Sequence, residues 1–70
     1  MNSNIKVILQ ISGKEIIEEI AESSTVEDLL RKLSLHPDAY IIVKDKRPVP
    51  LTKILEDGER LRLVKVASGG

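Results

Sequence analysis

Cysteine, tryptophan and phenylalanine are absent from the 70-residue chain, and Tyr40 is its only aromatic residue. The absence of cysteine excludes a disulfide framework, a thiolate metal site and a catalytic thiol. The protein therefore cannot carry a thioester on one of its own side chains. Its apolar residues are almost all Ile, Leu and Val. We therefore predict one aliphatic core. It is small, because a domain of this length buries only about 60% of the surface of its unfolded chain.

An excess of positive charge is also missing, because eleven Lys and Arg residues balance eleven Asp and Glu residues. A nucleic-acid surface usually carries a strong basic excess, and single-stranded sites add stacking aromatic rings. We therefore do not expect a nucleic-acid partner.

Long hydrophobic runs are missing as well. No apolar run approaches the roughly 20 residues that span a bilayer, and residues 1 to 4 lack the basic and apolar regions of a signal peptide. We expect a soluble cytoplasmic protein that does not contact a membrane.

The sequence shows no recognisable catalytic or metal-binding constellation. His36 is the only histidine, and no Cys, Ser or acidic residue lies at a familiar catalytic spacing from it. A phosphate-binding loop and a cluster of metal ligands are also missing. We predict that the protein is not an enzyme, has no catalytic or metal-binding residue and binds no cofactor of its own.

The first segment of the chain predicts one strand of a β-hairpin. Aliphatic residues recur there at every second position, which is typical of a half-buried strand: Ile5, Val7, Leu9 and Ile11. Ile8 breaks the polar face, so it either packs under a neighbouring element or belongs to an outward contact patch. Gly13 then supplies the positive φ of a tight turn.

The second strand of this hairpin, residues 15 to 21, has an ambiguous pattern. Its three isoleucines fit a helix as well as a strand, and Glu18 falls on the inward face if Ile16 and Ile20 do. We predict a strand because the preceding turn favours a hairpin. A β-bulge could shift the alternation by one residue.

A capping-box sequence predicts that a short helix begins at Ser24. In this motif the Ser24 hydroxyl and the Glu27 carboxylate accept hydrogen bonds from free backbone N–H groups of the first turn. Aliphatic residues at helical spacing form one face: Val26, Leu29, Leu30 and Leu33. Pro37 ends the helix, because proline cannot continue it.

The middle of the chain supplies two further strands. Residues 40 to 44 form an apolar strand that is covered or central, whereas the prolines around residues 49 to 51 permit only a brief edge strand. The following turn inserts Ile54 or Leu55 into the core. Four basic residues of this region are interpreted as solvated surface: Lys44, Lys46, Arg47 and Lys53.

The last strand indicates which side chains face outward near the C-terminus. In residues 60 to 66, Leu61 and Leu63 share one face. Val64 and Val66 share the other face, because side chains alternate along a strand. With the two leucines in the core, the two valines are exposed beside the end of the chain and form a candidate docking patch.

The chain ends in Ala67, Ser68, Gly69 and Gly70, which we predict to be a flexible tail after a domain of residues 1 to 66. Two glycines add no packing and lose much backbone entropy when ordered, but they can enter a narrow channel of another protein. The α-carboxylate of Gly70 is ionised at neutral pH. We therefore interpret Gly70 as a reacting residue and Gly69 and Ser68 as access residues. The alternative is a frayed end or a cloning remnant.

The order of these elements resembles the ubiquitin-like β-grasp family over nearly the whole chain. Residues 12 to 14 and 24 to 27 are similar to ubiquitin's first turn and helix start, and residues 60 to 64 followed by Gly70 resemble its last strand and arm. This resemblance implies an α+β fold, in which a mixed sheet of four or five strands carries one main helix on one face.

The short chain looks more like the prokaryotic branch of that family. This branch includes thiamine-pathway sulfur carriers, small subunits of molybdopterin synthase, a related carrier that thiolates tRNA, and the archaeal small modifier proteins. Residues 43 to 50, 57 to 61 and 68 to 70 carry this likeness. Ala67 and Ser68 stand where ubiquitin has arginines, which disfavours selection by ubiquitin's own activating enzymes. An aromatic residue that often follows the edge strand of thiamine carriers is missing, so the archaeal modifier and sulfur-carrier group is favoured.

The resemblance also implies a chemical role. An activating enzyme, using ATP and magnesium, would adenylate the carboxylate of Gly70. Sulfide from a transfer partner would then give a thiocarboxylate that carries sulfur to a thiazole, a pterin or a tRNA base. Alternatively, a lysine of a target protein would form an isopeptide conjugate. Candidate contacts for the activating enzyme are Val64, Val66, Ala67 and Ile8.

A second class of function remains open at this point. The same fold also serves as a binding module for RNA or protein, and the tail would then be incidental. We expect a monomer in either case, because a substrate that enters another protein's cleft needs no second copy.

Overall fold

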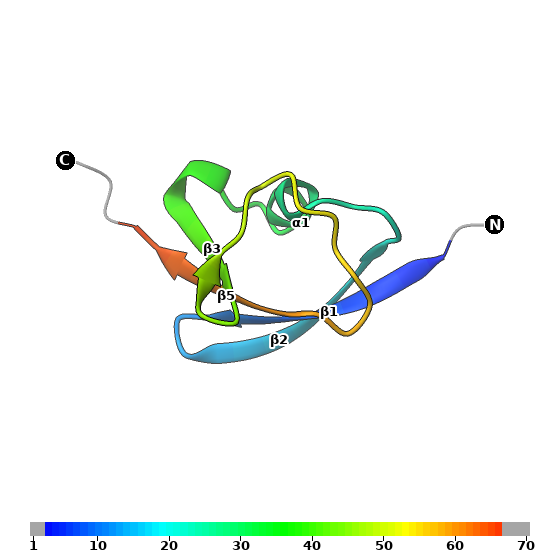
Figure 1. The fold of residues 1–70 in the computed structure, drawn as a ribbon, viewed down its shortest axis with the longest axis horizontal. Coiled ribbons are helices and arrows are strands. Elements are labelled where there is room, and N and C mark those ends of the chain that lie inside the picture. Colours follow the sequence, from blue (N-terminus) through cyan, green and yellow to red (C-terminus); the bar gives the residue numbers. More distant parts are fainter. Residues whose placement is uncertain (1–2, 67–70) are drawn as a thin grey trace.

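A computed structural model describes residues 3–66 of the chain. Within these residues, a five-stranded mixed sheet carries one α-helix across one face (Figure 1), which confirms the expected α+β β-grasp architecture. The elements in chain order are β1 (Asn4–Ile11), β2 (Lys14–Ala21), α1 (Val26–Lys32), the 3-10 helix η1 (Pro37–Ala39), β3 (Tyr40–Lys44), β4 (Arg47–Pro48) and β5 (Arg60–Lys65).

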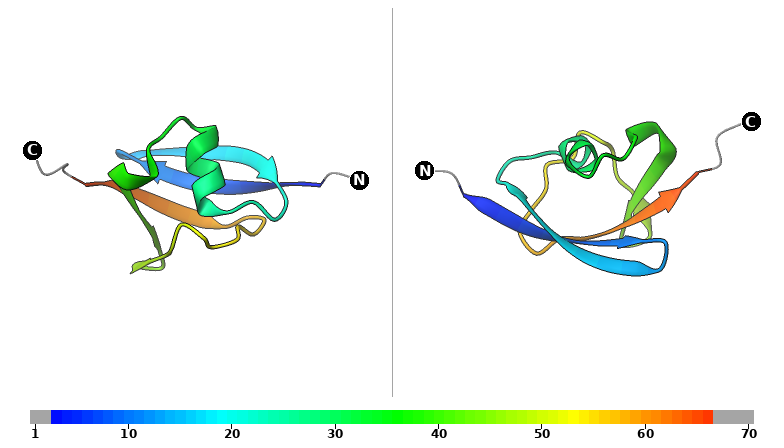
Figure 2. Two further views of the ribbon diagram at one scale, coloured as in Figure 1. Left: turned by 90° about the horizontal axis from the view of Figure 1, so that it is seen from above. Right: turned by 180° about the vertical axis from the view of Figure 1, so that it is seen from behind.

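The strands lie side by side in the order β2-β1-β5-β3-β4. β1 and β5 run parallel at the centre, and the other neighbours are antiparallel. Seen from above, α1 crosses the sheet, and β2 lies at the edge away from β3 and β4 (Figure 2).

β2 is a strand, as predicted, but the bulge that we considered for it is absent. β1 and β2 pair without interruption from Asn4 with Ala21 to Ile11 with Lys14. The register therefore places Glu18 on the inward face. That position is tolerable because Lys32 of α1 brings its Nζ to 3.6 Å from the Glu18 carboxylate.

The helix begins one residue later than predicted. Thr25 is its N-cap: Thr25 Oγ1 accepts from the Asp28 N–H at 3.2 Å, and the Asp28 carboxylate accepts from the Thr25 N–H at 3.0 Å. The prediction of Ser24 and Glu27 as the capping box was wrong. The Ser24 carbonyl accepts from the Leu55 N–H at 2.8 Å, which holds this residue in the loop and leaves the capping position to Thr25.

The helix also ends before Pro37. Ser34 has a φ of +61°, and its N–H donates to the Arg31 carbonyl at 3.0 Å. The Leu35 N–H donates to the Leu30 carbonyl at 2.8 Å, so this left-handed turn satisfies the last carbonyls of the helix. Pro37 begins the following 3-10 helix instead.

The core lies between the sheet and α1. It is aliphatic, as predicted, and consists of Ile5, Val7, Leu9, Ile20, Val26, Leu29, Leu30, Ile42, Leu55, Leu61 and Leu63. Leu55 rather than Ile54 is inserted from the loop before β5.

The brief edge strand is Arg47–Pro48, two residues earlier than predicted. The chain leaves the sheet after Val49, whose N–H donates to the Ile42 carbonyl. The described residues include no helix that is long and apolar enough to cross a membrane.

Candidate functional site

The outer face of the sheet, away from α1, exposes an aliphatic pair near the end of β5. Leu61 and Leu63 are buried against the helix, so Val64 points to the outer face as predicted. It pairs with Ile41 of β3 across the sheet. The two residues are 40% and 46% exposed. Ile41 was not predicted, because the continuous apolar run of β3 hides the alternation between its faces.

A hollow of about 380 Å³ lies beside Val64, between the β1–β2 turn and the end of β5. Its wall contains three basic residues, Lys14, Arg62 and Lys65. It also contains Glu15, whose carboxylate is 2.8 Å from Arg60 in an exposed ion pair. Because that acid already has a cation beside it, the hollow presents mainly positive charge. An acidic side chain next to an apolar one would fit this surface.

Val66 and Ile8 differ from their predicted positions in this patch. Val66 is half-buried, and its N–H donates to the Ala39 carbonyl at 2.9 Å, so it anchors the end of β5. Ile8 is half-buried opposite Ile17 of β2 and lies beside Arg60 at the start of β5. The structure therefore does not bring Ile8 to Val64, which lies at the other end of β5.

The remaining predicted residues are Ala67, Ser68, Gly69 and Gly70, and they lie outside the described residues. The described chain reaches them at the end of the molecule opposite the start of β1 (Figure 1). The roles of Gly70 as the reacting residue, of Gly69 and Ser68 as access residues and of Ala67 as a partner contact stay predictions.

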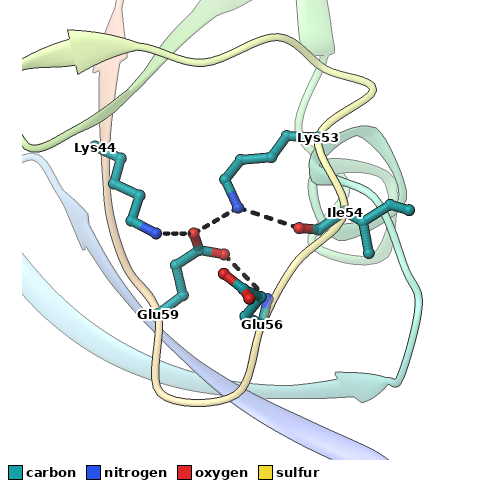
Figure 3. Close-up of polar contacts among 5 residues, drawn as sticks. All are labelled: Lys44, Lys53, Ile54, Glu56 and Glu59. Carbon is teal, nitrogen blue, oxygen red and sulfur yellow. Dashed lines mark hydrogen bonds and ion pairs between the residues drawn. The ribbon is translucent and has the colours of Figure 1, made fainter.

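One buried charged residue among residues 3–66 was missed by the sequence analysis. Glu59 precedes β5, and its side chain is 1% exposed. Its carboxylate forms ion pairs with Lys44 and Lys53 and accepts from the Glu56 N–H at 3.1 Å. Lys53 Nζ also donates to the Ile54 carbonyl at 3.1 Å. Figure 3 shows the two lysines converging on this carboxylate from the end of β3 and from the loop before β5.

The charges of this cluster stabilise one another. Burial raises the pKa of the Glu59 carboxyl, but the hydrogen bonds from Lys44 and Lys53 outweigh burial and hold that pKa below its ordinary value. The hydrogen bond with Glu59 raises the pKa of Lys44. The interpretation of Lys44 and Lys53 as solvated surface was therefore wrong. Lys44 and Lys53 join β3 and the loop between β4 and β5 to the start of β5 through one buried carboxylate.

The sequence does contain a signal for this cluster. Side chains alternate along β5, so the buried faces of Leu61 and Leu63 place Glu59 on the same side when the period is extended backwards. A buried carboxylate requires a cation or several donors. Lys53 and the more distant Lys44 supply the cations.

Metal ligands do not gather in the part of the chain that the structure describes: residues 3–66 contain no group of three or more His, Cys, Asp or Glu side chains that could hold an ion. His36 is exposed at the start of η1, and its side chain makes no capping hydrogen bond there.

The order of the strands and the crossing helix define the class of ubiquitin-like β-grasp proteins. Among solved structures, the Caldiarchaeum subterraneum ubiquitin has a TM-score of 0.71 and 20% identity, and the match covers 97% of this chain and all of that one. A de novo designed protein based on ubiquitin has a TM-score of 0.72 and 18% identity, covering 94% of this chain and 93% of that one. At these identities the likeness shows the fold alone.

The sequence comparison narrows the class to a family. The model of the family described as small archaeal modifier protein 2 matches residues 4–67, and the chain belongs to this family. An uncharacterized protein of Archaeoglobus fulgidus is 35% identical over 57 residues, which are 81% of this chain and 82% of that protein. The chain is thus a small ubiquitin-like modifier, and a modifier interacts in general with an activating enzyme and with target proteins.

Proposed function

We propose that the chain is a substrate of an activating enzyme in the cytoplasm, which adenylates the carboxylate of Gly70. The observation that carries this proposal is the outer face of β5, which exposes Val64 beside a basic hollow. In the sequence, the Ser-Gly-Gly end follows this strand after two intervening residues. Membership of a modifier family supports it. The tail is the reacting segment, and the domain before it supplies the surface by which the activating enzyme selects this chain.

The first step converts an unreactive carboxylate into an acyl donor. A carboxylate oxygen of Gly70 attacks the α-phosphorus of ATP, a new O–P bond forms, the bond between the α-phosphorus and the bridging oxygen breaks, and pyrophosphate leaves. The activating enzyme would use magnesium together with ATP for this step. The product is a mixed anhydride with AMP. Gly69 and Ser68 carry no large side chain, so they fit a narrow channel around the reacting phosphate.

The second step depends on the nucleophile. Hydrosulfide attacks the acyl carbon, displaces AMP and loses its proton, which leaves a terminal thiocarboxylate that can donate sulfur. A neutral lysine amine of a target protein attacks in the same way, displaces AMP and loses one proton, which gives an isopeptide bond. Both products require the same adenylate, so one activating enzyme serves both fates. Membership of the modifier family supports the conjugate, and the thiocarboxylate is proposed because it would form from the same adenylate.

Docking to the activating enzyme is expected to involve the pair Val64 and Ile41 together with the basic wall formed by Lys14, Arg62 and Lys65. The aliphatic pair offers a small apolar contact, and the cations favour acidic side chains of the enzyme. Because β1 ends at Ile11, opposite Leu63, the β1 side of β5 beyond that point has no strand beside it among the described residues.

The direct test is the mass of the protein purified from its own host. The thiocarboxylate predicts a species heavier by the mass difference between sulfur and oxygen, located at Gly70 by peptide mapping. The conjugate predicts Gly70 in isopeptide linkage to lysines of other proteins. If Gly70 is unmodified in every preparation and conjugates are absent, the proposal fails, and the binding-module alternative takes its place.

A substitution on β5 tests the docking surface. Val64→Asp is expected to reduce the rate of adenylation by about tenfold, because an acid replaces an apolar contact and opposes acidic side chains of the enzyme. The melting temperature is expected to change little, because surface substitutions usually alter stability by less than about 0.5 kcal/mol. Adenylation is measured as ATP-dependent pyrophosphate exchange with the purified activating enzyme.

The matched control for this experiment is Ile54→Asp. Ile54 is 58% exposed and lies in the loop before β5, away from the outer face of the sheet. The control variant should be adenylated at the normal rate. Equal loss in both variants would show that the effect is not specific to β5, and a large fall in melting temperature for Val64→Asp alone would mean that Val64 supports the fold.

A further inference from the structure

β2 is an unpaired edge of the sheet among the described residues (Figure 2). Two hydrogen bonds define which of its backbone groups face away from β1. In β1, the Ile8 N–H points toward β5 and donates to the Glu59 carbonyl, so the neighbouring residues of β1 face β2. At the end of β2, the Glu22 N–H points toward β1 and donates to the Ser3 carbonyl. Backbone groups alternate in direction along an antiparallel strand, so those of residues 15, 17, 19 and 21 point outward.

The chain itself already occupies two of these outward backbone groups, both of them carbonyls. Lys32 of α1 donates from Nζ to the Glu19 carbonyl. The Ser24 N–H donates to the Ala21 carbonyl at 3.2 Å. Within residues 15–19, the groups that remain open are the N–H and C=O of Glu15, the N–H and C=O of Ile17 and the N–H of Glu19. An incoming strand of about five residues would satisfy them.

The side chains along the open segment specify what such a strand must carry. Ile17 is 67% exposed on the outer face, the largest fraction of any large aliphatic residue that the structure describes, and Ile16 is 38% exposed on the inner face. Glu15 is paired with Arg60, and Glu18 with Lys32. Glu19 makes no ion pair within residues 3–66. The complementary strand has two adjacent aliphatic residues and a lysine or arginine opposite Glu19.

A second copy of this chain fits the edge poorly. Antiparallel pairing of two β2 strands about Ile17 would place Glu15 of each copy opposite Glu19 of the other. Like charges directly opposite each other destabilise a strand pair. The acids therefore protect the edge from self-association while they favour a basic partner.

We propose that residues 15–19 of β2 form a second interaction surface, which binds an extended, apolar and basic segment of a partner protein as a sixth strand. β1 and β5 separate this edge from Ile41 on β3, and the edge shares Glu15 with the hollow beside Val64. A partner strand on β2 leaves the aliphatic pair Val64 and Ile41 uncovered, because both residues lie on other strands of the sheet. The edge is therefore a recognition surface distinct from that pair, and it meets the docking surface only at the start of β2.

The test is a titration of the full-length, nitrogen-15-labelled protein with the peptide Ser-Lys-Thr-Val-Val-Thr-Ser, acetylated and amidated. In the antiparallel register its lysine lies opposite Glu19, and its two valines lie opposite Ile17 and Ile16. The amide signals of Glu15, Ile17 and Glu19 are expected to shift and to gain protection from hydrogen exchange. A peptide with proline in place of the first valine lacks the central donor and should cause no such shifts.

A charge exchange tests the register. Glu19→Lys is expected to weaken binding of the lysine peptide by about tenfold, because attraction becomes repulsion. A peptide with glutamate in place of its lysine should bind the Glu19→Lys variant better than the original protein. Ile17→Thr should also weaken binding, while Ile54→Thr, which changes an exposed isoleucine outside the sheet, should leave it unchanged.

Three results would overturn the proposal. Shifts that appear only around Val64 would place the peptide elsewhere. Concentration-dependent shifts of the β2 amides without any peptide would mean that a second copy occupies the edge. An absence of shifts at millimolar peptide would mean that the edge does not accept this class of strand. None of these results bears on adenylation of Gly70, so the two proposals fail independently.

Discussion

A variant that lacks Gly69 and Gly70 is expected to melt like the full chain and to lose adenylation below the limit of detection. The stability should not change, because the core and the Glu59 cluster lie entirely within residues 3–66. The chemistry should be lost, because shortening by two residues withdraws the carboxylate from the phosphate by about 7 Å in an extended chain. Such a displacement removes the geometry on which the reaction depends.

Two matched variants separate the effect of the length of the tail from the effect of the side chain at its last position. Removal of Gly70 alone leaves a glycine carboxylate one residue short, and Gly70→Ala keeps the length but adds a Cβ. Loss of activity in the first variant with partial activity in the second would show that position matters more than side chain. Thermal unfolding and pyrophosphate exchange, measured on the same preparations, provide the comparison. Full adenylation of the chain that lacks both glycines would refute the role of Gly70, and loss of folding would show that the tail supports the domain.

Much of the fold could be predicted because the informative patterns are local. The alternation in β1 and β5 and the helical spacing in α1 follow directly from which side chains must be buried. The errors occurred where two neighbouring residues satisfy the same local rule. Ser24 and Thr25 each precede an acid by three residues, and only the tertiary hydrogen bond from Leu55 to Ser24 decides between them. Similarly, the left-handed turn at Ser34 ends the helix before the more obvious Pro37 can do so.

The candidate site was predicted less completely, because its parts come from strands that are distant in the sequence. Val64 could be placed outward from the alternation of its own strand. Its neighbour Ile41 could not, since only the pairing of β3 with β5 brings the two together. The same reason explains Lys44 and Lys53, whose common partner is recognised only when Glu59 is known to be buried. Lys44 and Lys53 therefore belong to a structural cluster, whereas Lys46 and Arg47, the other two residues of the predicted patch, are exposed as expected.

Glu59→Ala is expected to cause the largest loss of stability of any substitution considered for this chain. It leaves two ammonium groups without their shared carboxylate and the Glu56 N–H without its acceptor. Removing one partner of a fully buried ion pair costs about 3–5 kcal/mol. The side chains of Lys44 and Lys53 are 33% and 22% exposed, so they can turn toward water and reduce this cost. We expect a loss of about 2 kcal/mol, or a fall of roughly 10 °C in melting temperature.

Lys46→Ala is the control for this experiment, because Lys46 is an exposed basic residue near the cluster and makes no ion pair within residues 3–66. It should change the melting temperature little. Glu59→Gln retains an acceptor for the Glu56 N–H but removes the charge, so it should fall between the wild type and Glu59→Ala. Denaturant unfolding of all three variants gives the comparison, and equal stability of Glu59→Ala and the wild type would contradict a structural role for the cluster.

The pH dependence distinguishes the charge of Glu59 from its packing. The pKa of Glu59 is lower in the folded than in the unfolded chain, so its contribution is present above the unfolded pKa and is lost as the pH falls through the folded one. The pKa of Lys44 is raised, so its contribution is present below the unfolded pKa and is lost as the pH rises through the folded one. The wild type should therefore lose stability at both limits, and Glu59→Ala should lose both of these contributions. If the difference in stability between the two proteins does not vary with pH, the cluster acts through packing alone.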